Sequence, residues 1–505
     1  MFFASLMWPI FHRAWPLTLS FTLACVAGCA AKQATLPVAE VRGTWLTTTA
    51  NDAIANPEKT ASTMRRLRQI GLNTVYVEAW KNGETQFPSA VYSHALGASD
   101  VTKPPRDLIQ ETLIEAHRNG LIFIAWFEYG FIAAHQSSMN RLRMQKAAWL
   151  SRDINGNDVA PNGFAWMNPL HPEARRFLLD LVLEAIDKYD LDGVQFDDRL
   201  VWPHISMGYD DYTQKIYATE HDGKLPPADH RDSAWMRWRA GKVNEVAKWF
   251  VQEVRDRRPG LVISLSPATY PWSWENHLLE WPSWSAWTHE ERLKSATFQS
   301  VASRNITPRW DEFIPQAYRL SYDAFAETWR EQMQAVTAWG ANRQRDLIAG
   351  IRIVGDGKDS SWQQLEDSIT FARRQGNGGH VLWFSRGVLD LYAAELAQLY
   401  KVSGPARSPH FAANWRNAAI TLQRLPRNGL ASGHVYWTGT PTPGDRYRVI
   451  GFENGAWQYI DDQPFDPSSS ITGELVLSLP AKFTRVELIV DRRDEMARML
   501  SRGVQ

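Results

Sequence analysis

Two adjacent carboxylates, Asp197 and Asp198, follow a short apolar run in the middle of the chain. The run contains Leu191, Val194 and Phe196, which suits a buried strand of a parallel sheet. Acids at the carboxyl end of such a strand lie where α/β barrels carry their chemistry. Glycoside hydrolysis uses two carboxyl groups, one to protonate the leaving oxygen and one to support the sugar cation. The pair therefore indicates a glycosidase site, and a helix cap is the structural alternative.

A third acid, Glu128, ends another apolar run and is the leading candidate for the general acid. Its neighbours are Trp126, Phe127 and Tyr129, and an aromatic setting of this kind is expected to raise the pKa of a carboxyl group. A raised pKa keeps the acid protonated near neutral pH, as proton donation to a leaving group requires.

Other acids compete with Glu128 for this role. Glu78 ends the preceding apolar run, and its structural alternative is an ion pair with Arg42 on the first run. Asp311 and Glu312 begin a later run and stay open as candidates.

Eight β-like runs, each followed by a helical pattern, must position these acids. Helical spacing is clear in 61–70, 107–119, 172–189, 235–257 and 321–339. This alternation predicts a (β/α)₈ TIM barrel over residues 41–404. A doubly wound sheet is the alternative, but no glycine-rich dinucleotide loop follows the first run. The runs are Val41–Thr48, Asn73–Trp80, Leu121–Glu128, Leu191–Asp198, Leu261–Pro267, Glu312–Ala317, Leu347–Val354 and Gly379–Ser385.

From residue 405 the pattern changes to short alternating runs separated by Gly, Pro, Asp and Ser. Strands of this length and spacing predict a small β-sandwich of the fibronectin-III or immunoglobulin type over residues 405–505. The runs lie at 418–422, 434–437, 446–452, 457–460, 474–479 and 485–490.

Long connections and tryptophans are the features that could shape a substrate cleft. Connections at 81–105, 130–168 and 202–230 follow the second, third and fourth runs, and long loops at this edge of a barrel shape clefts. The chain has 24 tryptophans, whose flat faces stack on sugar rings, although core packing is the ordinary role of any one of them. Clusters that are hard to bury together comprise Trp272 with Trp274, and Trp281 with Trp284 and Trp287.

The first 29 residues read as a targeting segment. His12 and Arg13 precede an apolar run over 15–27 that is short for a membrane span, and the run ends in Val-Ala-Gly-Cys at 26–29. This ending resembles a bacterial lipoprotein signal, which implies a lipid (palmitate) on Cys29 and a linker over 30–40. Ala30 after the cysteine favours the periplasmic side of the outer membrane. Both cysteines, Cys25 and Cys29, lie in this segment, so disulfide and thiol chemistry are not expected in the folded part.

The charge balance and the spacing of the histidines bear on which partners and cofactors the chain is expected to bind. The 55 basic and 55 acidic residues balance, so nothing indicates a nucleic-acid surface. The histidines are scattered without metal-ligand spacing, so neither a metal nor another cofactor is expected.

Motifs in a defined order make residues 41–400 resemble the bacterial glycosyl-hydrolase-like 10 family of (β/α)₈ glycosidases. The resemblance implies a polysaccharide substrate, with the glycan strands of peptidoglycan favoured. The family includes lipid-anchored members. Two pieces depart from the common form of the family, namely Glu-Tyr-Gly-Phe at 128–131 and the segment at 78–83. The matching pieces are VRGTW at 41–45, GLNTVY at 71–76, AWFE at 125–128, DGVQFDD at 192–198, SLSP at 264–267 and FIPQAYR at 313–319.

Related amylase-like and chitinase-like barrels place a catalytic carboxylate four residues beyond the glycine of the Asp-Gly strand. Counted from Gly193, this residue is Asp197, which strand alternation sends to the same side as Gln195. Asp197 is therefore the first candidate for the nucleophile or stabiliser, and Asp198 is a second acid that orients substrate or a neighbouring arginine. The residues expected to bind sugar are Arg42, Trp80, Trp126, Tyr129, Gln195, Trp272, Gln316, Tyr318, Arg319 and Trp383.

Three hypotheses follow. The first is a lipid-anchored glycosidase acting on peptidoglycan glycan or another extracellular polysaccharide. The second is a glycan-binding lipoprotein without catalysis, and the third is a metal-dependent deacetylase on a related barrel.

Overall fold

The computed structural model describes residues 38–97, 106–287, 307–340 and 342–410, together with segments between 420 and 502 that are mainly strands. The expected targeting segment with Cys29, and most of the expected linker, lie outside the described residues. The proposed boundary near residue 405 stays a prediction, because contacts group Pro37–Gln505 as one compact unit.

Eight parallel strands form one curled sheet in the order β11-β10-β9-β6-β3-β2-β13-β12. Parallel bridges from Phe313 to Leu347 and from Gln316 to Gly350 link the segments of its first and last strands. Each predicted run contains one of these strands, so the eight-strand prediction is confirmed. The bounds are β2 (Val41–Leu46), β3 (Thr74–Glu78), β6 (Ile122–Phe127), β9 (Gly193–Phe196), β10 (Val262–Leu265), β11 (Glu312–Phe313), β12 (Ala349–Arg352) and β13 (Gly379–Trp383).

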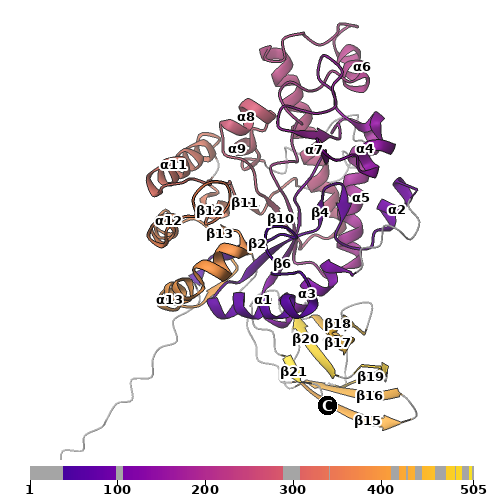
Figure 1. Ribbon diagram of the computed structural model, residues 1–505, viewed down its shortest axis with the longest axis vertical. Coiled ribbons are helices and arrows are strands. Elements are labelled where there is room, and N and C mark those ends of the chain that lie inside the picture. The colour runs from indigo at the N-terminus through magenta and orange to yellow at the C-terminus, as the bar shows by residue number, and fades with distance from the viewer. Residues whose placement is uncertain are drawn as a thin grey trace, which may run out of the picture. The chain divides into compact units, whose positions relative to one another are not determined.

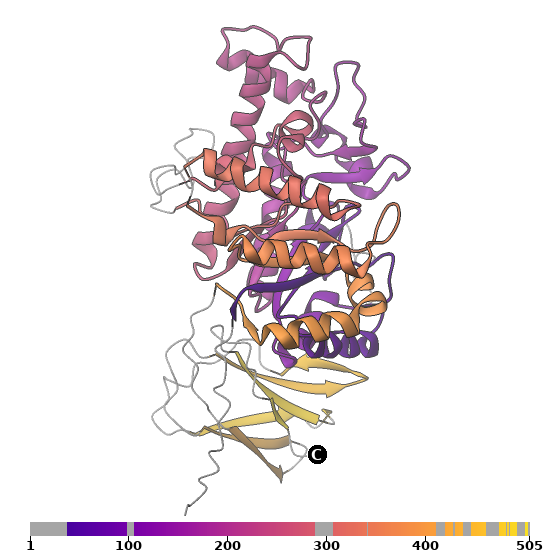
Figure 2. The same cartoon turned by 90° about the vertical axis from the view of Figure 1, so that its left-hand side faces the viewer.

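Helices lie around the sheet, and neighbours in sequence pack side by side (Figures 1 and 2). Several begin at a side-chain cap, such as Asn56 before α1 and Ser321 before α11, because these side chains accept an otherwise unpaired backbone N–H. Among the described helices, none has both the length and the apolar character needed to cross a membrane. The principal helices are α1 (Pro57–Ile70), α3 (Leu108–Arg118), α5 (Pro172–Lys188), α7 (Ser233–Arg257), α11 (Tyr322–Ala338), α12 (Trp362–Arg374) and α13 (Ala393–Ser403).

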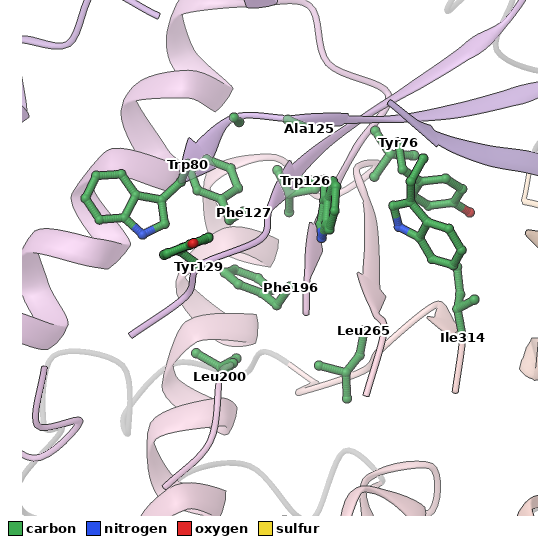
Figure 3. Packing of buried hydrophobic residues seen from close by; sticks show 14 of the residues in the cluster. Tyr76, Trp80, Ala125, Trp126, Phe127, Tyr129, Phe196, Leu200, Leu265 and Ile314 are labelled. Carbon is green, nitrogen blue, oxygen red and sulfur yellow. The ribbon is translucent and has the colours of Figure 1, made fainter. Parts of the chain in front are cut away.

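Alternation along the strands separates two layers of buried side chains (Figure 3). Phe127 and Phe196 lie 6.3 Å apart, and Phe196 contacts Phe250 of α7, so this layer fills the space between sheet and helices. Residues of the opposite parity, such as Trp45 and Trp126 with ring centroids 6.4 Å apart, fill the interior of the curled sheet. The interior is therefore packed with aromatic rings, and chemistry is confined to its ends.

The tryptophan cluster near residue 284 was expected in a groove, and this expectation is wrong for its buried members. Trp281 and Trp284 have no exposed surface. Trp284 stacks on Trp287 and on Trp310, with centroids 5.2 and 5.6 Å apart. Flat indoles bury well when they stack on one another, and this cluster belongs to the core.

The long connections carry secondary structure of their own. The segment after β3 holds β4 (Trp80–Lys81), β5 (Glu84–Thr85) and α2 (Ala90–Ala95), and the segment after β6 pairs β7 (Ile132–His135) with β8 (Phe164–Trp166). After β9, the buried Arg239 of α7 donates to the carbonyls of Ile205, Met207 and His230 and so holds this connection in place.

Beyond residue 410, the described strands form two antiparallel sheets, in line with the short alternating runs. One sheet has the order β15-β16-β19 and the other the order β18-β17-β20-β21. The bounds are β15 (Ile420–Arg427), β16 (Leu430–Trp437), β17 (Arg446–Glu453), β18 (Ala456–Tyr459), β19 (Glu474–Pro480), β20 (Arg485–Asp491) and β21 (Leu500–Arg502).

Candidate active site

The Asp-Gly pair before β9 fixes the strand that carries the two aspartates. Asp192 accepts hydrogen bonds from the backbone N–H of Phe123 at 2.8 Å and pairs with His117 Nε2 at 2.9 Å. A Cβ atom at Gly193 would lie 2.5 Å from Ile124 Cδ1 and 2.7 Å from the Val262 carbonyl, so only glycine fits between the flanking strands. The first half of the motif is structural, and it places the second half at the carboxyl edge of the sheet.

Asp197 is held from several sides and is only 4% exposed. Trp126 Nε1 donates to Asp197 Oδ2 at 3.1 Å, and Gln316 Nε2 donates to Oδ1 at 2.5 Å. The backbone N–H of Asp198 donates to the same Oδ1 at 2.8 Å. The prediction that Asp197 and Gln195 lie on the same side of the strand is confirmed, because Gln195 accepts from Trp45 Nε1 and Asp197 from Trp126 Nε1, both inside the sheet.

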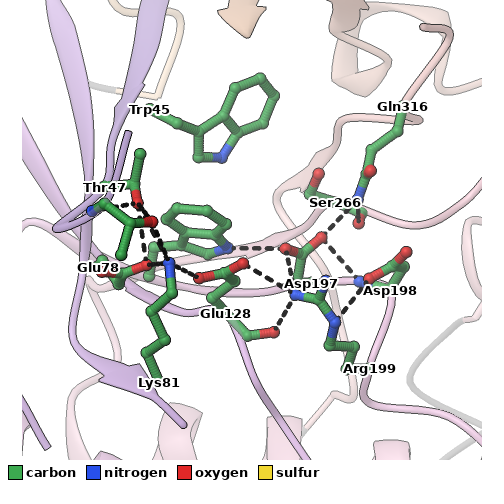
Figure 4. Close-up of polar contacts among 12 residues, drawn as sticks. Trp45, Thr47, Glu78, Lys81, Glu128, Asp197, Asp198, Arg199, Ser266 and Gln316 are labelled. Atoms are coloured by element: carbon green, nitrogen blue, oxygen red, sulfur yellow. Dashed lines mark hydrogen bonds and ion pairs between the residues drawn. The ribbon is translucent and has the colours of Figure 1, made fainter. Parts of the chain in front are cut away.

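Arg199 connects the carboxylates around it (Figure 4). Its Nη1 lies 3.3 Å from Glu128 Oε1 and 3.5 Å from Asp197 Oδ2, and its Nε lies 3.5 Å from Asp198 Oδ1. Because one nitrogen reaches both oxygens, Glu128 Oε1 and Asp197 Oδ2 are at most about 7 Å apart, so both carboxyl groups can reach one glycosidic bond. Asp198 is the more exposed aspartate, and its Oδ1 has no hydrogen-bond partner among the described residues.

Glu78 and Glu128 lie on either side of Lys81, whose Nζ is 2.5 Å from Glu78 Oε1 and 3.1 Å from Glu128 Oε2. Glu78 is fully buried and also accepts from the Thr48 backbone N–H at 2.8 Å and from both threonine hydroxyls at 47 and 48. Glu78 is therefore a fixed anchor at the end of β3, whereas Glu128 lies next to Asp197 through Arg199.

The pKa values of these acids are displaced in different directions. Burial raises the pKa of Asp197 well above its ordinary value, and the charge of Asp198 adds to the effect. Burial and the neighbouring Glu128 raise the pKa of Glu78 to about 7. Burial also acts on Glu128, but hydrogen bonding with Glu78 and the positive charges of Arg199 and Lys81 outweigh it and lower the pKa. The expectation of a raised pKa for Glu128 is therefore wrong, because two cations face its carboxylate.

A backbone contact fixes the loops that carry the two acids. The N–H of Phe131, after Glu128, donates to the carbonyl of Arg199 at 3.0 Å. Gly130 has a φ of 44°, and a Cβ there would lie 2.4 Å from this carbonyl oxygen. The loops after β6 and β9 therefore touch at a position that requires glycine.

Aromatic rings form the floor beside the carboxylates. Tyr318 and Trp383 stack with centroids 5.6 Å apart, and each contacts the buried Trp45. Both are only half-buried, so they are the rings of this group that a sugar can reach. Gln316, which holds Asp197, follows β11, so these predicted sugar-binding residues belong to one site.

Other predicted binding residues lie around this group. The Arg199 guanidinium lies over the ring of Tyr129 at 5.4 Å. Trp272 at the start of α8 (Trp272–His277) is 49% exposed, and its ring centroid lies 5.4 Å from that of His277. Trp272 is therefore available as a stacking surface at the rim.

Arg42 and Trp80, both predicted to bind sugar, have structural roles instead, and the sugar-binding role of Arg319 stays a prediction. Arg42 lies near the amino-terminal end of β2 and pairs with Glu40, so it forms neither a sugar contact at the carboxyl edge nor the ion pair with Glu78. Trp80 is fully buried, donates to the Gly130 carbonyl and packs on Tyr92 and Phe177 outside the sheet. Arg319 donates to its neighbour's carbonyl at Tyr318, and its other guanidinium nitrogen lies 3.4 Å from Thr269 Oγ1.

The acids at the start of β11 are not part of the site. Asp311 pairs with Arg255 at 2.6 Å, and Glu312 accepts from Tyr76 and lies 2.7 Å from His410. Both lie at the amino-terminal edge of the sheet, opposite Asp197.

Sequence reasoning missed the two cations of the site. Lys81 and Arg199 follow Glu78 and Asp198 closely in the chain, and this adjacency of charge was the available signal. Among the described residues, no group of three or more His, Cys, Asp or Glu side chains is placed to hold a metal ion.

The family model described as glycosyl hydrolase-like 10 matches residues 40–356, which include every residue of the carboxylate group. The chain belongs to this family. The resemblance expected from the motifs is thereby confirmed.

Relatives extend the match. The glycosyl hydrolase YngK of Bacillus subtilis is 26% identical over 246 residues, which are 45% of each chain, so the chain spans less than half of that relative. The glycosyl hydrolase DigH of Escherichia coli is 24% identical over 328 residues, 58% of this chain and 70% of DigH. The glycoside hydrolase domain of PgaB (BpsB) from Bordetella bronchiseptica shares the fold with a TM-score of 0.51 and 13% identity, over 71% of this chain and 98% of that one.

Proposed function

We propose that the chain is a glycoside hydrolase of a cell-envelope polysaccharide, with peptidoglycan glycan strands as the favoured substrate. The observation that carries the proposal is the pair Asp197 and Glu128, which share Arg199 and have pKa values displaced in opposite directions. Two carboxyl groups of unequal acidity are what glycoside hydrolysis requires. The choice of peptidoglycan rests on the family resemblance and on the lipoprotein-like signal.

The pKa directions exchange the roles expected from the sequence. In this proposal Asp197 is the proton donor, because burial raises its pKa, and it protonates the leaving glycosidic oxygen as the bond to the anomeric carbon breaks. Glu128 is ionised and either attacks the anomeric carbon or takes a proton from the attacking water. Lys81 and Arg199 keep Glu128 ionised and hold it in place.

The aromatic floor supports this proposal from the substrate side. A sugar stacked on Trp383 and Tyr318 would lie beside Gln316 and Asp197. The exposed Trp272 extends the surface for a longer glycan chain.

We propose further that a lipid on Cys29 anchors the protein on the periplasmic side of the outer membrane. We also infer that the curled sheet closes into a complete (β/α)₈ barrel and that the two antiparallel sheets pack as a β-sandwich. The bridges between β11 and β12 support the first, and the order of the strands after residue 410 supports the second.

The test uses purified full chain and peptide-free glycan strands, followed by mass spectrometry. Defined oligosaccharides released by the wild type and not by Asp197→Asn support the hydrolase. Intact strands would reject peptidoglycan glycan as the substrate. If the Asn variant and the wild type bind the strands equally and neither cuts them, the protein is a glycan-binding protein.

A second measurement assigns the roles. On a dinitrophenyl glycoside of the released sugar, the leaving group needs no protonation, so Asp197→Asn should keep much of its activity while Glu128→Gln loses it. The reverse pattern would return the roles to those expected from the sequence.

A further inference from the structure

A hollow of about 960 Å³ lies at the amino-terminal edge of the sheet, opposite the carboxylate group. It is bordered by residues before or at the start of β2, β10, β11, β12 and β13. Neither the family resemblance nor the proposed hydrolysis gives this hollow a role. Its lining includes the arginines Arg42, Arg255, Arg309, Arg345, Arg373 and Arg407, and the acids Glu40, Asp311 and Asp346.

Positive charge exceeds negative charge on this lining, because the acids are shared. Glu40 pairs with both Arg42 and Arg373. Asp346 lies 2.5 Å from Arg343 and 3.8 Å from Arg309. Each of these carboxylates therefore faces two guanidinium groups, and the remaining positive charge is available to an anion.

Two guanidinium groups have donors that nothing in the described chain satisfies. Nη2 of Arg42 is buried without a hydrogen-bond partner, and the residue is only 1% exposed. Arg345 is exposed, and its side chain has neither a hydrogen bond nor an ion pair with any described residue. A buried charged donor without an acceptor is costly, so an acceptor from outside the described chain is expected there.

We propose that this hollow is a binding site for a phosphate-bearing anion. Guanidinium forks match the several acceptor oxygens of a phosphate group, and a twice-charged anion balances the excess of arginines over acids on this lining. The volume exceeds that of a single phosphate and lies in the range of ligand sites, so the phosphate belongs to a larger molecule such as a phosphorylated metabolite or a lipid headgroup.

The test measures binding to the purified full chain by calorimetry with inorganic pyrophosphate and, separately, with a short-chain phosphatidylglycerol below its micelle concentration. Acetate is the control anion. Binding of pyrophosphate indicates a soluble ligand, binding of the lipid alone indicates a headgroup, and both results support a phosphate site. Acetate binding as tightly as the phosphate ligands, or no binding of either, overturns the proposal.

Variants locate the site. Arg345→Gln and Arg309→Gln should each weaken binding by about tenfold, because each removes a charged donor from the exposed rim of the hollow. Arg65→Gln, an exposed arginine of α1 outside the lining, removes the same charge and should leave the dissociation constant within about twofold. An equal loss in all three variants would show that binding follows net charge and would reject the site. Glycan hydrolysis by these variants should be unchanged, so this proposal and the proposed hydrolase fail separately.

Discussion

The two edges of the curled sheet treat buried glutamates in opposite ways. At the amino-terminal edge, burial raises the pKa of Glu40, but the hydrogen bond and charge of Arg373 and the charge of Arg42 outweigh it and bring the pKa to about 2. At the carboxyl edge, burial and the neighbouring Glu128 bring the pKa of Glu78 to about 7. At the first edge Glu40 has two arginine partners, whereas at the second edge Glu78 lies beside another carboxylate. Crowding that costs stability is typical of a site arranged for chemistry.

The largest expected effect is on catalysis at the carboxyl edge. Asp197→Asn should lower the rate of glycan hydrolysis by about 10³-fold, because the proton for the leaving group is lost. Its free energy of unfolding should change by less than about 1 kcal/mol, since the amide has nearly the same shape and removes a charge site from a crowded group. Hydrolysis rates and urea unfolding check the two halves. A large loss of stability with little loss of rate would make Asp197 a structural residue.

The matching change at the amino-terminal edge should act on stability alone. Glu40→Gln leaves Arg42 and Arg373 without their shared carboxylate and should lower the free energy of unfolding by about 3 kcal/mol at pH 7. The rate per folded molecule should stay unchanged. The contribution of Glu40 is present above its unfolded pKa of 4.5 and is lost as the pH falls toward 2. Unfolding by urea at several pH values measures both predictions.

Glu78→Gln should give the opposite dependence on pH. Because the pKa of Glu78 is raised in the folded state, its contribution to the free energy of unfolding is fully present below pH 4.5. This contribution is lost as the pH rises through about 7. Relative to wild type, the Gln variant should therefore gain about 2 kcal/mol in stability between pH 5 and pH 8. If the two glutamate variants changed in the same direction, the contrast between the edges would be lost.

The smallest expected effect concerns the aromatic floor. Trp383→Ala should raise KM about fivefold, because a stacked aromatic contact contributes roughly 1 kcal/mol to binding. Trp339→Ala is the control, since this tryptophan at the end of α11 is 47% exposed and lies outside the site. Equal changes in KM for both variants would argue against sugar binding at Trp383.

Sequence patterns were most informative where a property repeats along one strand or helix. Apolar runs and helical spacing located all eight strands, and alternation placed Asp197 correctly, because burial leaves a periodic record in the chain. The contacts that tune the acids join separate strands. Lys81, which follows β3, reaches Glu128 after the neighbouring β6, and Arg373 of α12 reaches Glu40 before β2. Such distances, and with them the lowered pKa of Glu128, depend on how neighbouring strands are staggered, which no single run records.

The close contact between Gly130 and the Arg199 carbonyl means that the backbone of the two loops sets the distance between Glu128 and Asp197. Side-chain rotamers adjust little when the loops themselves touch. In Gly130→Ala, the added methyl group would clash with the Arg199 carbonyl and move the loop that carries Asp197 away from Glu128. The distance between the two carboxyl groups differs between glycosidases that retain the anomeric configuration and those that invert it. The absence of a side chain at position 130 therefore helps to set the distance on which the stereochemical outcome depends.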